Sequence, residues 1–188
     1  MDAANADRAI LALDLATTTG WAIATPLAVA AWPVGVMGAK GPIDGVTYGS
    51  ITFGGKGRAC LFLEFSRWLD RLIKQGGIGL AAIEAPVHAR TMPAMRIAGG
   101  LAAISEMICA FRSINSLEVP PTTVKKHFTG SGAATKPQMM AACDARGWLP
   151  PDNNAGDALA VLDWAVHSLG NNTITSSDKQ LIIKRKRR

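Results

Sequence analysis

The sequence predicts an α/β fold built on a mixed five-stranded sheet, with an antiparallel hairpin at one edge, parallel strands at the centre and helices on both flanks. Short apolar runs of strand length recur along the chain. The first two follow each other directly, whereas the later ones alternate with segments whose apolar residues are spaced three and four apart. Adjacent strands pair as hairpins, and strands separated by a helix pair in parallel.

The hairpin comes first in the chain. Residues 9–15 form an apolar run, the turn signal Thr17-Thr18-Thr19-Gly20 follows, and residues 21–24 return as the second strand. A third strand is expected at residues 46–53, after a loop at residues 25–45 that is rich in Gly, Pro and Ala.

The rest of the chain alternates helices with strands. Gly76-Gly77 ends the first helix, and Pro86 closes the strand that follows it. The predicted helices cover residues 58–75, 95–112, 122–128, 137–147 and 154–168, and the predicted strands cover residues 78–85 and 117–119.

Composition indicates a single folded domain. The chain has 188 residues, of which 48% are apolar and 18% charged. We expect a folded domain at residues 9–169, a disordered start at residues 1–8 and a polar, basic tail at residues 170–188, whose last five residues are all Lys or Arg. No apolar run reaches the roughly 18 residues of a membrane helix, and no signal-peptide pattern is present. A cytoplasmic protein that does not enter the membrane is therefore expected.

Two predicted buried strands each carry one carboxylate near their carboxyl end. These residues are Asp14 and Glu84. An isolated buried carboxylate is costly unless its pKa shifts or a cation or metal pairs with it. Ligands of open α/β sheets bind beyond the carboxyl ends of the strands, so a site is expected there.

A third acid, Asp157, lies in the first turn of the last predicted helix. A favourable interaction with the helix dipole would explain Asp157 without a functional site. An N-cap role would explain Asp152, which follows Pro150-Pro151. Three or four oxygen ligands that converge from two strands and a helix start instead suit Mg²⁺ or Mn²⁺. Two such ions about 3.5 to 4 Å apart can clamp the attacking and leaving oxygens of a phosphodiester.

Four segments in order resemble the motifs of the RuvC Holliday-junction resolvases, particularly the shorter phage-type members. The segments are ILALDLATTTGWAI (10–23), AIEAP (82–86), VKKHFTGSGAATKPQ (124–138) and DNNAGDALAV (152–161). The resemblance implies a ribonuclease-H-like fold, a homodimer, and metal-dependent paired nicking of four-way DNA junctions in a bacterial cell or a phage-infected host.

The resemblance also implies roles for single residues. Asp14, Glu84 and Asp157 would be the catalytic, metal-binding carboxylates. The family commonly places an acid or a histidine three residues before the last aspartate, where this chain has Asn154. Either the Asn154 amide ligates the ion, or Asp152 reaches in, or the site rests on three acids.

Basic residues gather in one part of the sequence. Residues 88–136 carry six Lys or Arg against two acids, so a polyanion is expected to dock there. The resemblance makes Lys125 and Lys136 the phosphate-contacting lysines, and Lys126, His88 and Arg90 are further candidates for DNA contact. His127, beside the lysine pair, is either one more phosphate contact or a polar residue on a helix face.

Three alternatives to a junction resolvase follow from the same residues. A nuclease with this fold can act on other branched DNA or on RNA, because surfaces rather than the acids select the substrate. Asn154 favours a catalytically impaired junction-binding protein, and Asp14 to Gly20 also resembles the phosphate loop of sugar kinases, which need a second domain.

For a homodimer, the predicted helix at residues 95–112 offers Met95, Met107 and Ile108 as the contact face.

Overall fold

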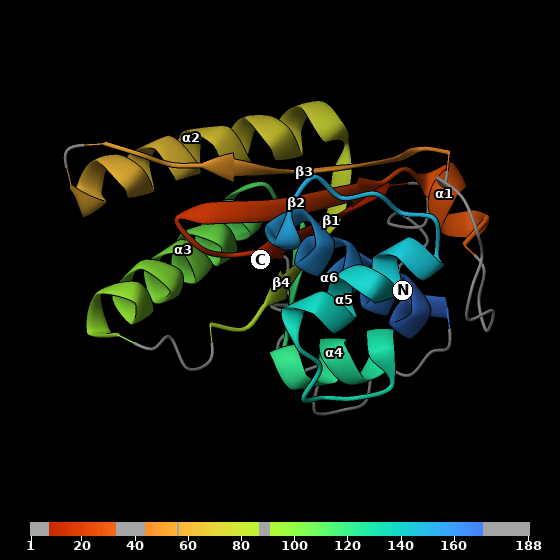
Figure 1. Cartoon of the computed structure of the whole chain (residues 1–188). Helices are drawn as coiled ribbons and strands as arrows, with labels where there is room; N and C mark the ends of the chain where they lie inside the picture. Colours follow the sequence, from red (N-terminus) through yellow and green to blue (C-terminus); the bar gives the residue numbers. More distant parts are fainter. Residues whose placement is uncertain (1–7, 33–43, 56, 87–90, 171–188) are drawn as a thin grey trace.

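The computed structural model describes residues 8–32, 44–55, 57–86 and 91–170 (Figure 1). Residues 1–7 and the basic tail at 171–188 lie outside this range, so the expectations for both ends stay predictions. His88 and Arg90 also lie outside the described residues.

The sheet has five strands in the order β3-β2-β1-β4-β5. Neighbours β3, β2 and β1 pair antiparallel, and β1, β4 and β5 pair in parallel. This mixed sheet confirms the fold class that the sequence predicts. The strands are β1 (Ala9–Asp14), β2 (Thr18–Ala24), β3 (Val46–Thr52), β4 (Ile78–Glu84) and β5 (Asn115–Val119).

The hairpin differs from the prediction in two places. Thr18, Thr19 and Gly20 belong to β2, so the turn lies before them rather than at them. The expected loop after β2 begins with a short helix, α1 (Pro26–Ala30), in which the Thr25 side chain accepts a hydrogen bond from the backbone N–H of Ala28. A threonine cap followed by proline in the first turn is a helix-start signal that the sequence contains.

Two groups of helices cover the two faces of the sheet. One face packs against α2 (Arg58–Gly76) and α3 (Met92–Phe111). The other packs against α1 and against α4 (Pro121–Thr129), α5 (Lys136–Ala145) and α6 (Asn153–Gly170), and Figure 1 shows α4, α5 and α6 grouped together, apart from α2 and α3.

Alternation along the strands assigns each residue to one of these faces. In β1, Leu11 and Leu13 pack on the α2–α3 side, while Ile10 and Ala12 pack on the α6 side. Ala12, Ala22 and Ala82 are all fully buried on the α6 side. These small side chains leave room for α6 to lie directly on the sheet, and α6 is itself rich in buried alanine.

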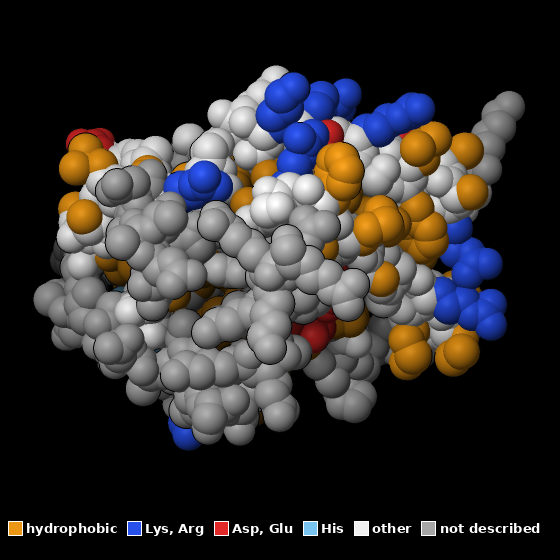
Figure 2. Space-filling view, turned by 180° about the vertical axis from the view of Figure 1, so that it is seen from behind, with side chains coloured by type: hydrophobic (Ala, Val, Ile, Leu, Met, Phe, Trp, Pro, Cys, Tyr) orange, Lys and Arg blue, Asp and Glu red, His pale blue; other side chains and the backbone are white. Residues whose placement is uncertain are grey.

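Helix α3 combines a buried face with an exposed apolar face. By length and composition alone it is apolar enough to cross a membrane, a test that core helices of other proteins also pass. Leu101, Ile108 and Cys109 lie in the core, whereas Met107 and Phe111 are exposed. The expectation that Ile108 belongs to a dimer contact face is therefore wrong, because its side chain packs against the sheet and is only 6% exposed. Figure 2 shows apolar side chains among Lys and Arg side chains on the side of the molecule where α2 and α3 lie.

Candidate metal and nucleic-acid site

Asp14 and Glu84 are the last residues of two neighbouring parallel strands. The register of β1 with β4 pairs Ala12 with Ala82 and Leu13 with Ile83, so the two acids stand one step beyond the last pair. Both continue the series of residues that faces α6, which includes Ile10 and Ala12 in β1 and Leu80 and Ala82 in β4. Strand pairing alone therefore brings the two carboxyl groups together on the α6 side of the sheet.

Asp157 reaches this position because α6 begins very close to β2. Gly20 pairs with Asp14 across the hairpin, and its backbone also touches the first turn of α6. A Cβ atom at residue 20 would lie 1.9 Å from the backbone oxygen of Asn154, a contact that no side chain can make. Gly20 thus sets the distance between α6 and the sheet; the sequence pattern had assigned this glycine only to a turn.

The three acids, Asp14, Glu84 and Asp157, form what we call the acid cluster. Burial raises the pKa of Glu84 to about 9, with further upward contributions from the charge of Asp14 and from the hydrogen bond that Glu84 shares with Asp14. Burial and then the charge of Asp14 raise the pKa of Asp157 to about 6, and burial also raises the pKa of Asp14. Burial therefore disfavours ionisation of each acid, and the charges of neighbouring acids add to this effect at Glu84 and Asp157 but not at Asp14.

Two lysines lie close enough to act on the acid cluster. Lys125, a half-buried residue of α4, lowers the pKa values of Glu84 and Asp157. Lys136, exposed at the start of α5, acts in the same direction on Asp14 and Asp157. Among the described residues these are the cations that act on the acids, and they leave the pKa values of all three raised. The cluster is therefore short of positive charge.

The other predicted site residues lie elsewhere. Lys126 is exposed and lines a separate hollow together with His127 and His167. The carboxylate of Asp152 accepts hydrogen bonds from the Ser50 hydroxyl at one oxygen and from the backbone N–H of Ala155, at 2.9 Å, at the other. Asp152 therefore caps the start of α6, with one hydrogen bond at each carboxylate oxygen.

Asn154 occupies the first turn of α6, three residues before Asp157. Residues three apart on a helix lie on the same side of it, so the Asn154 amide is on the side of the helix from which Asp157 meets the strands. Its backbone carbonyl is the group that Gly20 accommodates.

The donor set of the acid cluster fits a hard divalent cation. Its oxygen ligands come from carboxylates, which are the ligands Mg²⁺ and Mn²⁺ prefer, and the charges of neighbouring acids contribute to the raised pKa values of Glu84 and Asp157. Ion binding would release the proton that Glu84 retains near neutral pH.

No family model matches the sequence, and no curated protein matches it. Among solved structures, the chain is similar to Thermus thermophilus RuvC in complex with a Holliday junction substrate, with a TM-score of 0.68 and 14% identity over 87% of this chain and 96% of that one. A second Thermus thermophilus RuvC structure gives a TM-score of 0.66 at 15% identity, over 87% of this chain and 96% of that one.

A third similar structure comes from a eukaryote. The yeast mitochondrial Holliday junction resolvase Ydc2 gives a TM-score of 0.60 at 10% identity, over 93% of this chain and 84% of that one. Identities this low establish the fold and leave the activity to be argued from the site. The chain thus has the fold of the RuvC-type resolvases, as its sequence motifs predicted.

Proposed function

We propose that this chain is a metal-dependent endodeoxyribonuclease that resolves four-way DNA junctions by paired nicks. The supporting observation is the convergence of Asp14, Glu84 and Asp157 at one edge of the sheet, with Lys125 and Lys136 beside them. The same fold occurs in Thermus thermophilus RuvC, whose structure contains a Holliday junction substrate.

The acid cluster would hold Mg²⁺ or Mn²⁺ through Asp14, Glu84 and Asp157, with the Asn154 amide as a further neutral ligand. When bound, such ions lower the pKa of a coordinated water and neutralise charge that develops on a phosphodiester. The protein's own contribution is to gather the carboxylates on strands and a helix before substrate arrives, so that no reorganisation is needed during the reaction.

Lys125 and Lys136 would hold the DNA backbone over the acids. Both lie near the carboxylates yet belong to different helices, α4 and α5. A phosphate that contacts both lysines would be placed over the acid cluster, because each lysine already acts on two of its carboxylates. Lysine contacts of this kind fix position on the nucleic acid without reading its sequence.

The experiment that tests the activity is a nicking assay with a metal titration. Four-way junctions, flaps and RNA–DNA hybrids would be compared in Mg²⁺, in Mn²⁺ and in EDTA. We expect symmetric nicks in four-way junctions that require the ion. Equal cleavage of flaps or hybrids would favour a broader nuclease, and tight junction binding without nicking would favour a binding protein whose site Asn154 has weakened.

Paired nicks require two active sites, and we propose that a second copy of the chain packs against α3. Met92, Met95, Met107 and Phe111 are 60%, 44%, 61% and 76% exposed along this helix. Met107 and Phe111 also line an open hollow of about 330 Å³ with residues of α2. An exposed apolar surface of this kind is typical of a protein contact.

Sedimentation at micromolar concentration tests this contact. We expect a dimer, and we expect Phe111→Lys to convert it to a monomer. Leu149→Lys is the matched control, because Leu149 is also 76% exposed but lies outside α3. A wild-type monomer, or a dimer unaffected by Phe111→Lys, would contradict the contact.

A further inference from the structure

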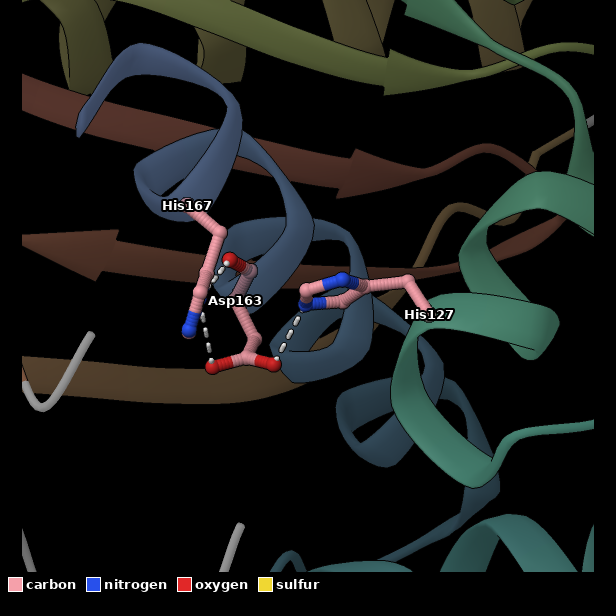
Figure 3. A group of neighbouring side chains, drawn as sticks. All are labelled: His127, Asp163 and His167. Atoms are coloured by element: carbon pink, nitrogen blue, oxygen red, sulfur yellow. Dashed lines mark hydrogen bonds and ion pairs between the residues drawn. The ribbon is translucent and has the colours of Figure 1, made fainter. Parts of the chain in front are cut away.

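A second group of titratable side chains lies between α4 and α6, away from the acid cluster. Its members are His127 from α4 and Asp163 and His167 from α6, and we call it the His–Asp–His cluster (Figure 3). One nitrogen of each imidazole and one carboxylate oxygen all lie within 4.8 Å of one another. Asp163 and His167 stand one helical turn apart, so both side chains project from the same side of α6 toward His127.

The carboxylate at the centre is held in place from two sides. Asp163 is only 5% exposed; its Oδ1 accepts a hydrogen bond of 2.9 Å from Nε1 of Trp32, and its Oδ2 lies 2.9 Å from Nε2 of His127. Burial works to raise the pKa of Asp163, but the hydrogen bonds from His127 and Trp32 outweigh it and hold this pKa below its usual range. Asp163 is therefore an oriented carboxylate that favours its ionised form.

The imidazoles connect this carboxylate to solvent. The side chains of His127 and His167 are 26% and 19% exposed. Both line an open hollow of about 840 Å³, whose wall also includes Thr122, Lys126 and Trp164. An ion can therefore reach the cluster, and water can occupy a coordination position on the open side.

We propose that His127, Asp163 and His167 bind a transition-metal ion of the zinc class, with the remaining coordination position open to the hollow. Two imidazole nitrogens and one carboxylate oxygen are one of the donor sets that Zn²⁺ takes in sites with three protein ligands. Zinc–ligand distances of about 2.0 to 2.2 Å put the ligand atoms of a tetrahedral site roughly 3.3 Å apart. Nε2 of His127 lies 2.9 Å from Oδ2 of Asp163, Nδ1 of His167 lies 3.6 Å from Oδ1, and one ligand atom from each residue lies within 4.8 Å of the other two, so a small approach of the side chains would bring them to that spacing. Ligation through Nδ1 of His167 would replace its 3.0 Å contact with the Asp163 backbone carbonyl.

Trp32 holds the Asp163 carboxylate from the side away from His127. Its indole N–H bonds the Asp163 oxygen other than the one that meets His127. Partners of this kind orient a ligating carboxylate, and their loss typically weakens metal affinity by about 10- to 100-fold. A bound ion would join α4 to α6, the helices that carry Lys125 and Asp157 of the proposed DNA site.

Binding of Zn²⁺ to the full, untagged chain tests the proposal by calorimetry. The measurement uses an Asp14→Asn/Asp157→Asn background, so that uptake by the acid cluster does not contribute. We expect one Zn²⁺ per chain and a higher melting temperature in Zn²⁺. His127→Gln keeps a donor for Asp163, and His167→Asn keeps a donor for the Asp163 backbone carbonyl that His167 contacts at 3.0 Å. Each should weaken Zn²⁺ binding by more than about 100-fold, and Trp32→Phe by about 10- to 100-fold.

Co²⁺ replaces Zn²⁺ in a second measurement that needs no change to the cluster. A four-coordinate site gives Co²⁺ strong visible absorption, whereas a six-coordinate oxygen site gives it weak bands. Strong absorption in the Asp14→Asn/Asp157→Asn chain supports the proposal. Weak bands, or stoichiometric Zn²⁺ binding that survives both histidine substitutions, would overturn it. Loss of Zn²⁺ binding on going from the wild-type chain to the Asp14→Asn/Asp157→Asn background would overturn it too, because the ion would then belong to the acid cluster.

Discussion

The acid cluster and the His–Asp–His cluster share helix α6 but balance charge in opposite ways. In the acid cluster, carboxyl groups face one another and the pKa values of all three are raised. In the His–Asp–His cluster, a single buried carboxylate receives hydrogen bonds from an indole and an imidazole, and its pKa is lowered. Burial disfavours the charged form in both places, and only at Asp163 do the neighbouring hydrogen-bond donors reverse its effect.

This difference separates two kinds of candidate metal site. The acid cluster retains a proton on Glu84 near neutral pH, so a hard ion such as Mg²⁺ would bind there by displacing that proton and taking the carboxylates as ligands. The side chains of the His–Asp–His cluster already hydrogen-bond to one another, so an ion has to compete with protons for the imidazole nitrogens. Zinc-class metals bind imidazole well and are therefore favoured there.

The largest expected effect is on nicking when one acid is removed. Asp14→Asn should lower the rate of Mg²⁺-dependent nicking by at least about a thousandfold, because losing a ligand charge removes roughly 4 kcal/mol of transition-state stabilisation. Junction binding in EDTA should stay nearly unchanged. Asp144→Asn is the matched control, since Asp144 is exposed on α5. Nicking that survives Asp14→Asn would remove the acid cluster from the reaction.

Neighbouring lysines provide the next comparison. Lys125 acts on the acid cluster, whereas Lys126 lines the hollow beside the His–Asp–His cluster. Lys125→Gln should slow nicking by about a hundredfold, the usual cost of losing a positioned donor at a reacting group. Lys126→Gln should change the rate much less. Equal effects in a single-turnover assay would mean that both lysines act only as general DNA contacts.

Gly20→Ala tests whether backbone contact sets the position of Asp157. The new methyl group would collide with the Asn154 carbonyl, so α6 must move from the sheet. We expect the free energy of unfolding to fall by about 1 to 3 kcal/mol, with a further loss of nicking. Gly54→Ala is the control, because a Cβ atom there has no neighbour within 4 Å. Chemical denaturation of both variants gives the comparison, and equal stability would show that α6 does not depend on Gly20.

The last expected effect is the dependence of stability on pH without metal. The pKa values of the acid cluster are raised in the folded state, so the folded chain holds more protons than the unfolded chain between about pH 5 and pH 9. In EDTA, stability should therefore fall as pH rises through this window, by at least about 1 kcal/mol. Glu84→Gln should flatten the profile in thermal melts, and an unchanged profile would contradict the raised pKa of Glu84.

The sequence predicted the sheet and the placement of two acids because both follow from local patterns. Strand alternation and strand ends are visible in apolar runs, and they put Asp14 and Glu84 at one edge. The His–Asp–His cluster was not predicted, because Trp32, His127 and Asp163 come from segments far apart in the chain and meet only through packing. The i, i+4 spacing of Asp163 and His167 was the one local signal. The role of Gly20 was missed for the same reason, since its neighbour Asn154 is distant in sequence.

Helix α6 also fixes the rotation about its axis that separates Asp157 of the acid cluster from Asp163 of the His–Asp–His cluster. Asp157 and Asp163 are six residues apart on one uninterrupted helix, a rotation of roughly 240° about its axis. Inserting or deleting a single residue between them would swing one cluster by about 100° relative to the other, so that no such change could keep both in place. The five residues between them, 158–162, are all buried as well, so both the length of this stretch and the size of its side chains are constrained.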